Sequence, residues 1–415
     1  MTGQKEQRLI SDKLLWYFTI AYLGNGFACA QYNIMAQPLQ YYFLKGLHWK
    51  PDVVASYMAL FMIPWVMKPL FGIVCDFLPL FGYRRKSYLV LANVTAAIAF
   101  ILATLAPTPP YVVATILVTA VCMSMSTAIY IGLAVQSDRG GNKNRLYFSV
   151  QQICYYSASI LAALVGGKIC QTCEPFKAFD YCAFLAVLPS TVVAILTMIL
   201  VKEEKSQLNK ELFEKTKTSF KRAFNTKQLW FIAAFSFLWS FYPTYGTPLY
   251  VFESETLKFS QDIIGQLAGW NAAGMLLGAI SYNLVTRNMP PKVEALTVMI
   301  TCSIAASSWL FLSTPETGAI LELIRGMANN WVILSIYCLA SRVCPKGTEV
   351  SIMALMVSFR NLATSSANHV GGFLFVKMFN EQIAPLAIIT AIMPLLSLLL
   401  IPFIPDHKKE SEEPD

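Results

Sequence analysis

Apolar residues occur along this chain in long runs that are separated by short polar stretches. Most runs hold about 20 residues, the length that a helix needs to cross the hydrocarbon core of a bilayer. Longer runs fit by tilting. The pattern predicts twelve membrane-spanning helices, at about Leu14–Met35, Val53–Asp76, Ser87–Ala106, Tyr111–Val135, Tyr147–Ile169, Tyr181–Val201, Gln228–Tyr250, Ile263–Thr286, Glu294–Ser313, Ala319–Arg342, Ser351–Val376 and Ala384–Ile404.

The composition agrees with this pattern. Of the 415 residues, 56% are hydrophobic and only 13% are charged, whereas a soluble protein has about 25% charged residues. This composition excludes an ordinary soluble enzyme, a disordered chain and a nucleic-acid-binding protein. The polar residues 1–12 lack the apolar core of a signal peptide, so we expect the first span to be retained in an all-α membrane protein.

The basic residues predict the orientation of these spans. Loops on one side, together with both chain ends, hold 23 Lys and Arg, and loops on the other side hold six. Because basic loops stay in the cytoplasm, we expect both termini to be cytoplasmic. The protein is then a multi-pass integral protein of the plasma (inner) membrane.

A basic stretch divides the spans six and six. We expect an N-terminal six-helix bundle at 1–201, a cytoplasmic linker at 202–227, a C-terminal six-helix bundle at 228–404 and a cytoplasmic tail at 405–415. Apolar residues recur in the linker at roughly helical spacing, so it is either a regulatory amphipathic helix at the membrane surface or, more simply, a connection.

The segment that follows the second span carries a recognisable motif. It reads PWVMKPLFGIVCDFLPLFGYRRKSY from Pro64 to Tyr88, and it resembles the signature of the folate–biopterin transporter family, a branch of the major facilitator superfamily. Weaker blocks at 247–265 and 344–361 follow in the family's order. The resemblance implies two six-helix bundles and alternating access. One departure is that residues 124–135 in the fourth span lack the acidic residues typical of the family.

The resemblance also implies a latch between the bundles. In facilitators a carboxylate at the end of the second span pairs with basic residues, and such a contact exists in only one arrangement of the bundles. A glycine on the same stripe lets a neighbouring helix approach. The alternative is that the basic residues only anchor the topology. The candidate latch residues are Gly72, Asp76, Gly82, Arg84 and Arg85.

Ionisable residues within spans are costly, and by default they face a cavity or a partner. Lys68 lies in the second span, and Arg360 in the eleventh has no acid within helical reach. Glu322 and Arg325 are spaced i, i+3 in the tenth span, so they form either an internal ion pair or part of a binding site. Arg360 contacts either substrate or another helix. The net positive charge favours an anionic substrate.

The first and seventh spans correspond to each other, and both are interrupted by Gly or Pro, which points to the central site of a transporter. Aromatic rings there could stack on a pterin, with amides bonding its edge, although Trp and Tyr also mark membrane interfaces. The candidate substrate-binding residues are Arg360, Arg325, Lys68, Asn25, Gln31, Tyr242, Tyr245, Trp270, Asn271 and Asn361, with Glu322 as the coupling candidate.

These features predict a monomeric secondary transporter that carries a small folate- or pterin-like anion, coupled to protons or to exchange. The alternative is a carrier of the same fold for another metabolite, such as S-adenosylmethionine or a nucleotide. We expect no cofactor, metal or nucleic-acid partner. An enzyme or receptor is disfavoured because P-loop, HExxH and GxSxG motifs and a large loop are absent from the sequence.

Overall fold

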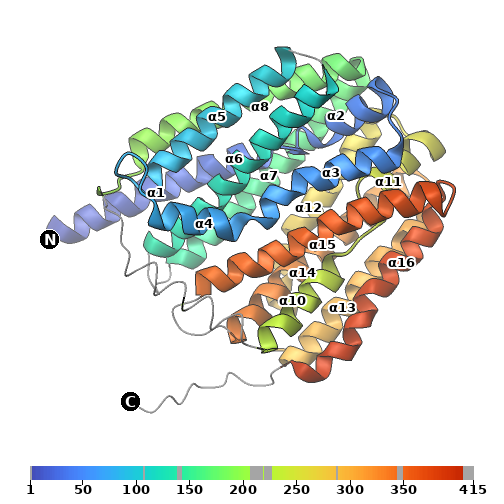
Figure 1. Cartoon of the computed structure of the whole chain (residues 1–415). Helices are drawn as coiled ribbons and strands as arrows, with labels where there is room; N and C mark the ends of the chain where they lie inside the picture. Colours follow the sequence, from blue (N-terminus) through green and yellow to red (C-terminus); the bar gives the residue numbers. More distant parts are fainter. Residues whose placement is uncertain are drawn as a thin grey trace.

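The computed structural model describes residues 2–105, 108–137, 143–205, 218, 227–286, 288–343 and 349–404. Its long helices run along one another in a single bundle (Figure 1). The elements are α1 (Thr2–Phe27), β1 (Ala28–Cys29), β2 (Tyr32–Asn33), α2 (Ala36–Tyr41), η1 (Tyr42–Gly46), α3 (Pro51–Val66), α4 (Lys68–Phe77), α5 (Lys86–Leu105), α6 (Pro109–Ser137), α7 (Lys143–Thr172), α8 (Pro175–Leu200), α10 (Lys227–Ser240), α11 (Thr247–Val251), η2 (Phe252–Thr256), α12 (Gln261–Thr286), α13 (Pro291–Ser307), η3 (Ser308–Phe311), α14 (Pro315–Val343), α15 (Glu349–Lys377), α16 (Ile383–Leu395) and η4 (Leu396–Phe403).

Helix is present at each of the twelve predicted positions. Nine of these segments, among the described residues, are long and apolar enough to cross a membrane. The other three positions are occupied by α1, α10 with α11, and α15. The prediction of a purely helical chain needs one small correction, because β1 and β2 form a two-stranded antiparallel ladder.

Several helices begin earlier in the sequence than the predicted spans do. Helices α3, α6, α8, α13 and α14 each begin at a proline. Proline is tolerated in the first helical turn because its missing N–H has no intrahelical acceptor there. Helix α8 therefore starts at Pro175, six residues before the predicted span. Helix α1 starts at Thr2 instead of Leu14, in a polar stretch that hydropathy excludes from the membrane.

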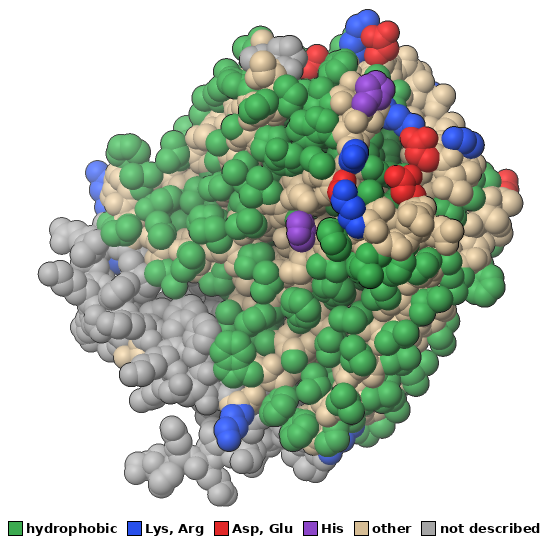
Figure 2. Space-filling model, turned by 45° about the vertical axis from the view of Figure 1, so that its right-hand side comes forward, with side chains coloured by type: hydrophobic (Ala, Val, Ile, Leu, Met, Phe, Trp, Pro, Cys, Tyr) green, Lys and Arg blue, Asp and Glu red, His purple; other side chains and the backbone are tan. Residues whose placement is uncertain are grey.

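The surface is that of a membrane protein. Large apolar side chains such as Phe184, Leu188, Leu284 and Leu399 are each more than half exposed. Figure 2 shows a face covered mostly by hydrophobic side chains, with Lys, Arg, Asp and Glu gathered towards one end. An apolar belt of this kind is unstable in water and is stable against lipid tails. Most of the predicted linker (206–217 and 219–226) and the tail (405–415) lie outside the described residues.

We call α1 to α8 the first half and α10 to η4 the second half. Helix α3 packs against α15, and α7 packs against α12 (Figure 1). Glycines permit this contact, since a Cβ atom on Gly265 would lie 2.6 Å from the Gly167 Cα atom. Similarly, a Cβ on Gly372 would lie 2.3 Å from the Cβ of Ala55. The halves therefore approach to backbone distance at both helix pairs.

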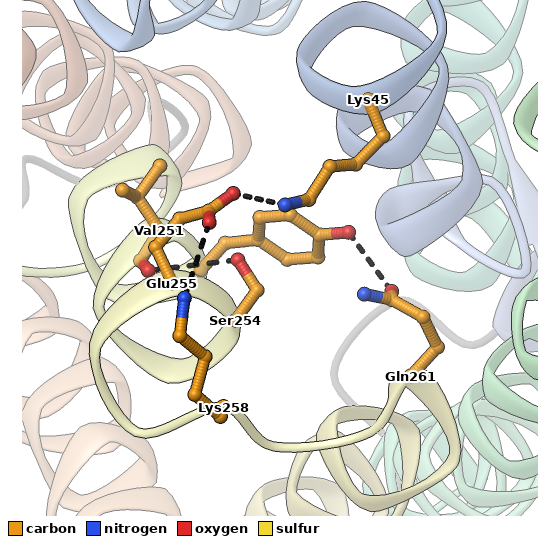
Figure 3. A network of polar contacts seen from close by, with 7 residues as sticks. Lys45, Val251, Ser254, Glu255, Lys258 and Gln261 are labelled. Carbon is orange, nitrogen blue, oxygen red and sulfur yellow. Dashed lines mark hydrogen bonds and ion pairs between the residues drawn. The ribbon is translucent and has the colours of Figure 1, made fainter.

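The end of the bundle near α11, opposite the chain termini, is closed by polar contacts between the halves. We call it the distal end. Lys45 of η1 forms an ion pair with Glu255 of η2, and Lys258 approaches the other oxygen of Glu255 (Figure 3). Lys377 Nζ lies 3.4 Å from Asp52 Oδ2, and Gln37 Nε2 donates to the Gln261 carbonyl at 2.7 Å. These contacts hold the distal ends of the halves together.

Candidate functional site

The break in the first span is confirmed, and it positions polar side chains against α3. After α1 ends at Phe27, the β1–β2 turn places Ala30 and Asn33 at positive φ, a conformation that Asn tolerates well. The Asn33 side chain donates to the Asn25 carbonyl at 2.8 Å. Among the described residues, Asn25 is buried and its Nδ2 has no partner.

The same turn brings Gln31 and Tyr32 onto α3. Gln31 is buried, and its Nε2 donates to the Phe61 carbonyl at 3.1 Å, while its Oε1 has no partner among the described residues. The Tyr32 ring meets the Trp65 ring edge-on, with centroids 5.6 Å apart. This geometry is favourable for aromatic pairs. Two unused amide atoms, of Asn25 and Gln31, thus lie on the first half.

The predicted second span is broken between Val66 and Lys68. Pro69 has no N–H, so the Trp65 carbonyl loses its intrahelical donor. Asn361 of α15 replaces that donor, with its Nδ2 3.0 Å from the Trp65 oxygen. The break also directs Lys68 back over Trp65, with the ammonium 4.5 Å from the ring centroid, a cation–π contact. Asn361, a predicted substrate residue, therefore joins the halves in this conformation.

Arg360 lies beside Asn361 on α15, and its charge acts on Lys68, Tyr32 and Tyr242. Lys68 and Arg360 are both half-buried. Among the residues that the structure describes, neither has an ion-pair partner. Two cations from opposite halves therefore act on each other without a compensating carboxylate. Such an arrangement in a membrane interior favours an anion between or beside them.

A second charged group lies on α14. The predicted ion pair of Glu322 with Arg325 is confirmed, and Asn271 Nδ2 donates to the other carboxylate oxygen at 2.8 Å. Arg325 is 6% exposed, and its guanidinium lies 4.5 Å from the centroid of the Trp309 ring. This arginine is thus held between a carboxylate and an aromatic face.

The break in the seventh span is also confirmed. Helix α10 ends at Ser240 and α11 starts at Thr247, after Gly246 at a φ of 90°. Tyr242 is half-buried in this segment, and Tyr245 is 49% exposed although its phenol interacts electrostatically with buried Arg325. Tyr245 is therefore within electrostatic range of the charged group on α14.

Trp270 is not placed with these residues. It is 47% exposed and shares a helix stripe with exposed Leu277 and Leu284, the pattern of a lipid-facing side. Its neighbour Asn271 points to Glu322 instead. Cavity lining by Trp270 therefore stays a prediction, because a mid-helix position does not determine which side of the helix faces lipid.

The backbone of the predicted latch segment is bound by Glu203, which follows the end of α8. The Glu203 carboxylate accepts the backbone N–H groups of Arg84 and Lys86 at 3.1 and 2.8 Å, and that of Arg85 as well, at the start of α5. A carboxylate is favoured at a helix N-terminus. Gly82 forms the preceding turn with a φ of 83°. The side chain of Asp76 lies outside the described residues, as do residues 344–348 of the third motif block.

The expected role of Gly72 needs correction. Among the described residues, a Cβ atom on Gly72 would meet no heavy atom within 4 Å. Gly72 lies on α4, which is nearer the chain termini than the distal end is (Figure 1). Close packing of described residues at Gly72 is therefore absent from this conformation.

Most of the chain matches a known family. The model of the BT1 family covers residues 25–314 and 318–415. The chain belongs to the BT1 family.

Its relatives carry transporter names. This BT1-family chain is 25% identical to the folate-biopterin transporter of Synechocystis sp., over 90% of this chain and 80% of the relative. It is 22% identical to folate transporter 2 of Plasmodium falciparum, over 91% and 85%. It is also 22% identical to probable folate-biopterin transporter 5 of Arabidopsis thaliana, over 96% and 85%.

Solved structures show the fold. A D-xylose-proton symporter superposes with a TM-score of 0.73 at 14% identity, covering 95% of this chain and 98% of the symporter. A POT family transporter in complex with 5-aminolevulinic acid also gives 0.73, at 13% identity and with 94% and 96% covered. The BT1-family chain therefore has the major facilitator fold predicted from its sequence.

Three residues of this BT1-family member were missed as site candidates. Trp65 was quoted only as part of a motif, yet it contacts Tyr32, Lys68 and Asn361. Glu253 was placed beyond the seventh span, but it is buried next to Arg325. Glu203 was assigned to the linker. A signal existed only for Trp65, because it directly precedes a proline-flanked break beside an intramembrane lysine.

Proposed function

We propose that this BT1-family chain is a secondary transporter that moves a folate- or pterin-like anion across the membrane by alternating access. The observation that carries the proposal is the pair Lys68 and Arg360, two half-buried cations from opposite halves without a carboxylate partner among the described residues. Relatives named as folate and folate-biopterin transporters support the substrate class.

Each proposed role follows from the chemistry of the side chain. The planar guanidinium of Arg360 can hold a carboxylate through two parallel hydrogen bonds, while Lys68 supplies a point charge. The Tyr32, Trp65 and Tyr242 rings can stack on a pterin, and the free amide atoms of Asn25 and Gln31 can bond its edge. Arg325, already paired with Glu322, is proposed to act on the substrate through its charge.

The coupling and the orientation are part of the same proposal. Either a proton gradient or exchange for a second solute drives transport, with Glu322 as a proton-binding group. The excess of basic residues on the loops at the side of the termini supports cytoplasmic termini and residence in the plasma (inner) membrane. The distal closure then faces outwards, which corresponds to a state closed to the exterior.

The test is uptake of labelled folic acid and labelled biopterin by purified protein in liposomes. Arg360→Ala should weaken folic acid binding about 10- to 100-fold, because it removes charge-assisted hydrogen bonds of about 1.5–3 kcal/mol. Lys177→Ala removes an exposed cation of α8 and serves as the control. Uptake of S-adenosylmethionine or a nucleotide in place of both probes would contradict the assigned substrate, and equal effects of the two variants would contradict the role of Arg360.

A further inference from the structure

Three ionisable side chains meet in the interior of the second half. Glu253 of η2, Glu322 and Arg325 are 5%, 3% and 6% exposed. Arg325 interacts electrostatically with Glu253 and is bonded to Glu322. With both carboxylates ionised, this buried group carries one more negative charge than positive charge. Burial of an uncompensated charge is costly, so the group is stable when one carboxyl group binds a proton.

The hydrogen bonds divide the two carboxylates into different classes. Glu322 uses both oxygens, one with Arg325 Nη2 and one with Asn271 Nδ2. Glu253, among the described residues, has neither an ion-pair partner nor a side-chain hydrogen bond. Arg325 keeps two buried donors, Nε and Nη1, without acceptors in the described part of the chain. In this conformation Arg325 thus neutralises Glu322, and its Nε and Nη1 groups remain as donors for Glu253.

We propose that Glu253 and Glu322 share Arg325 and together hold one exchangeable proton, which is the proton coupled to transport. This inference rests on the proposed transport function and adds Glu253, which no motif indicates. In the closed distal state the proton resides on Glu253, and Arg325 pairs with Glu322. When the proton leaves, the ionised Glu253 accepts hydrogen bonds from Arg325 Nε and Nη1.

The position of Glu253 links its proton to the movement of the halves. It lies on the same short helix as Glu255, which pairs with Lys45 of the first half (Figure 3). Opening the distal end must break this ion pair, and η2 is then free to shift. The Tyr245 phenol interacts electrostatically with both Arg325 and Glu253, and its side chain is half exposed. Opening and proton exchange are thereby coupled.

Other charged residues near α14 are engaged elsewhere. Asp262 at the start of α12 accepts a hydrogen bond from Gln266 at 3.1 Å. Glu294 of α13 accepts hydrogen bonds from Tyr282 and Ser335. Arg360 of α15 acts on Lys68 and two tyrosines. In the described part of the chain, the ionisable groups that interact with Arg325 are therefore Glu322, Glu253 and the Tyr245 phenol.

The experiment is infrared difference spectroscopy of the purified protein without substrate, titrated near neutral pH, where exposed carboxyl groups are already ionised. The wild-type protein should show the loss of one protonated carboxyl group as pH rises. Glu253→Gln removes that group. Glu322→Gln should abolish the signal as well, because Arg325 is then free to pair with an ionised Glu253. Glu316→Gln, an exposed carboxylate on the same helix α14, is the control and should keep the signal.

Glu253→Asp retains a carboxyl group and should also keep the signal, which separates loss of the proton site from misfolding. A signal that survives Glu253→Gln, or one that is lost in Glu253→Gln and unchanged in Glu322→Gln, would overturn the shared site. Because no substrate is present, failure to transport folic acid or biopterin would refute the proposed substrate and leave this result standing.

Discussion

Two intramembrane arginines of this protein sit in opposite electrostatic surroundings. Arg325 is buried against Glu322 and the Trp309 ring, with Glu253 nearby. Arg360 is half-buried, its charge acts on Lys68 and two tyrosines, and among the described residues it has no ion-pair partner. The first is compensated within the protein and the second is not. The same residue type is therefore compensated by a carboxylate in one place and, among the described residues, uncompensated in the other.

The largest difference between Arg325 and Arg360 should be in how much each contributes to the stability of the folded protein. Arg325→Leu leaves two buried carboxylates without their cation, and we expect it to lower the free energy of unfolding by about 3–5 kcal/mol. Arg360→Leu removes an uncompensated cation and should cost little or stabilise the protein. Thermal unfolding in detergent measures both changes. A larger loss for Arg360→Leu than for Arg325→Leu would reverse the comparison.

A smaller effect tests the contact beside Arg360. Asn361→Ala leaves the Trp65 carbonyl without the donor that replaces the missing N–H of Pro69. We expect a loss of about 0.5–1.5 kcal/mol in stability, and a weaker loss of folic acid binding than Arg360→Ala causes. Ser358→Ala, which removes a local bond to Ala354 on the same helix, is a matched control. Binding that falls equally in Asn361→Ala and Arg360→Ala would make Asn361 a direct ligand.

Local patterns predicted much of this structure. Hydropathy placed the spans because apolar length is what a membrane requires. Pro243 and Gly246 marked the break at 241–246, whereas Gly24 and Gly26 lie inside α1 and the first break follows them at 28–35. The Glu322–Arg325 pair was predictable because residues at i and i+3 face each other. The spans, the breaks and this ion pair all arise from residues that lie close together in the sequence.

The remaining contacts depend on packing between distant segments. Asn361 and Trp65 are 296 positions apart, and their bond exists only because α15 crosses the break in α3. Glu253 interacts with Arg325 although the two lie on separate elements, η2 and α14. Hydropathy predicts where a helix lies but neither its rotation about its axis nor the arrangement of the two halves. It therefore could not predict that Trp270 is exposed, or that no described residue packs against Gly72.

The most direct test of the uncompensated cation pair is ligand-induced thermal stabilisation of the double variant Lys68→Met with Arg360→Leu. We predict that folic acid raises the unfolding temperature of the wild-type protein and leaves that of the double variant unchanged, while both proteins fold. Equal stabilisation of the two proteins by folic acid would contradict the account.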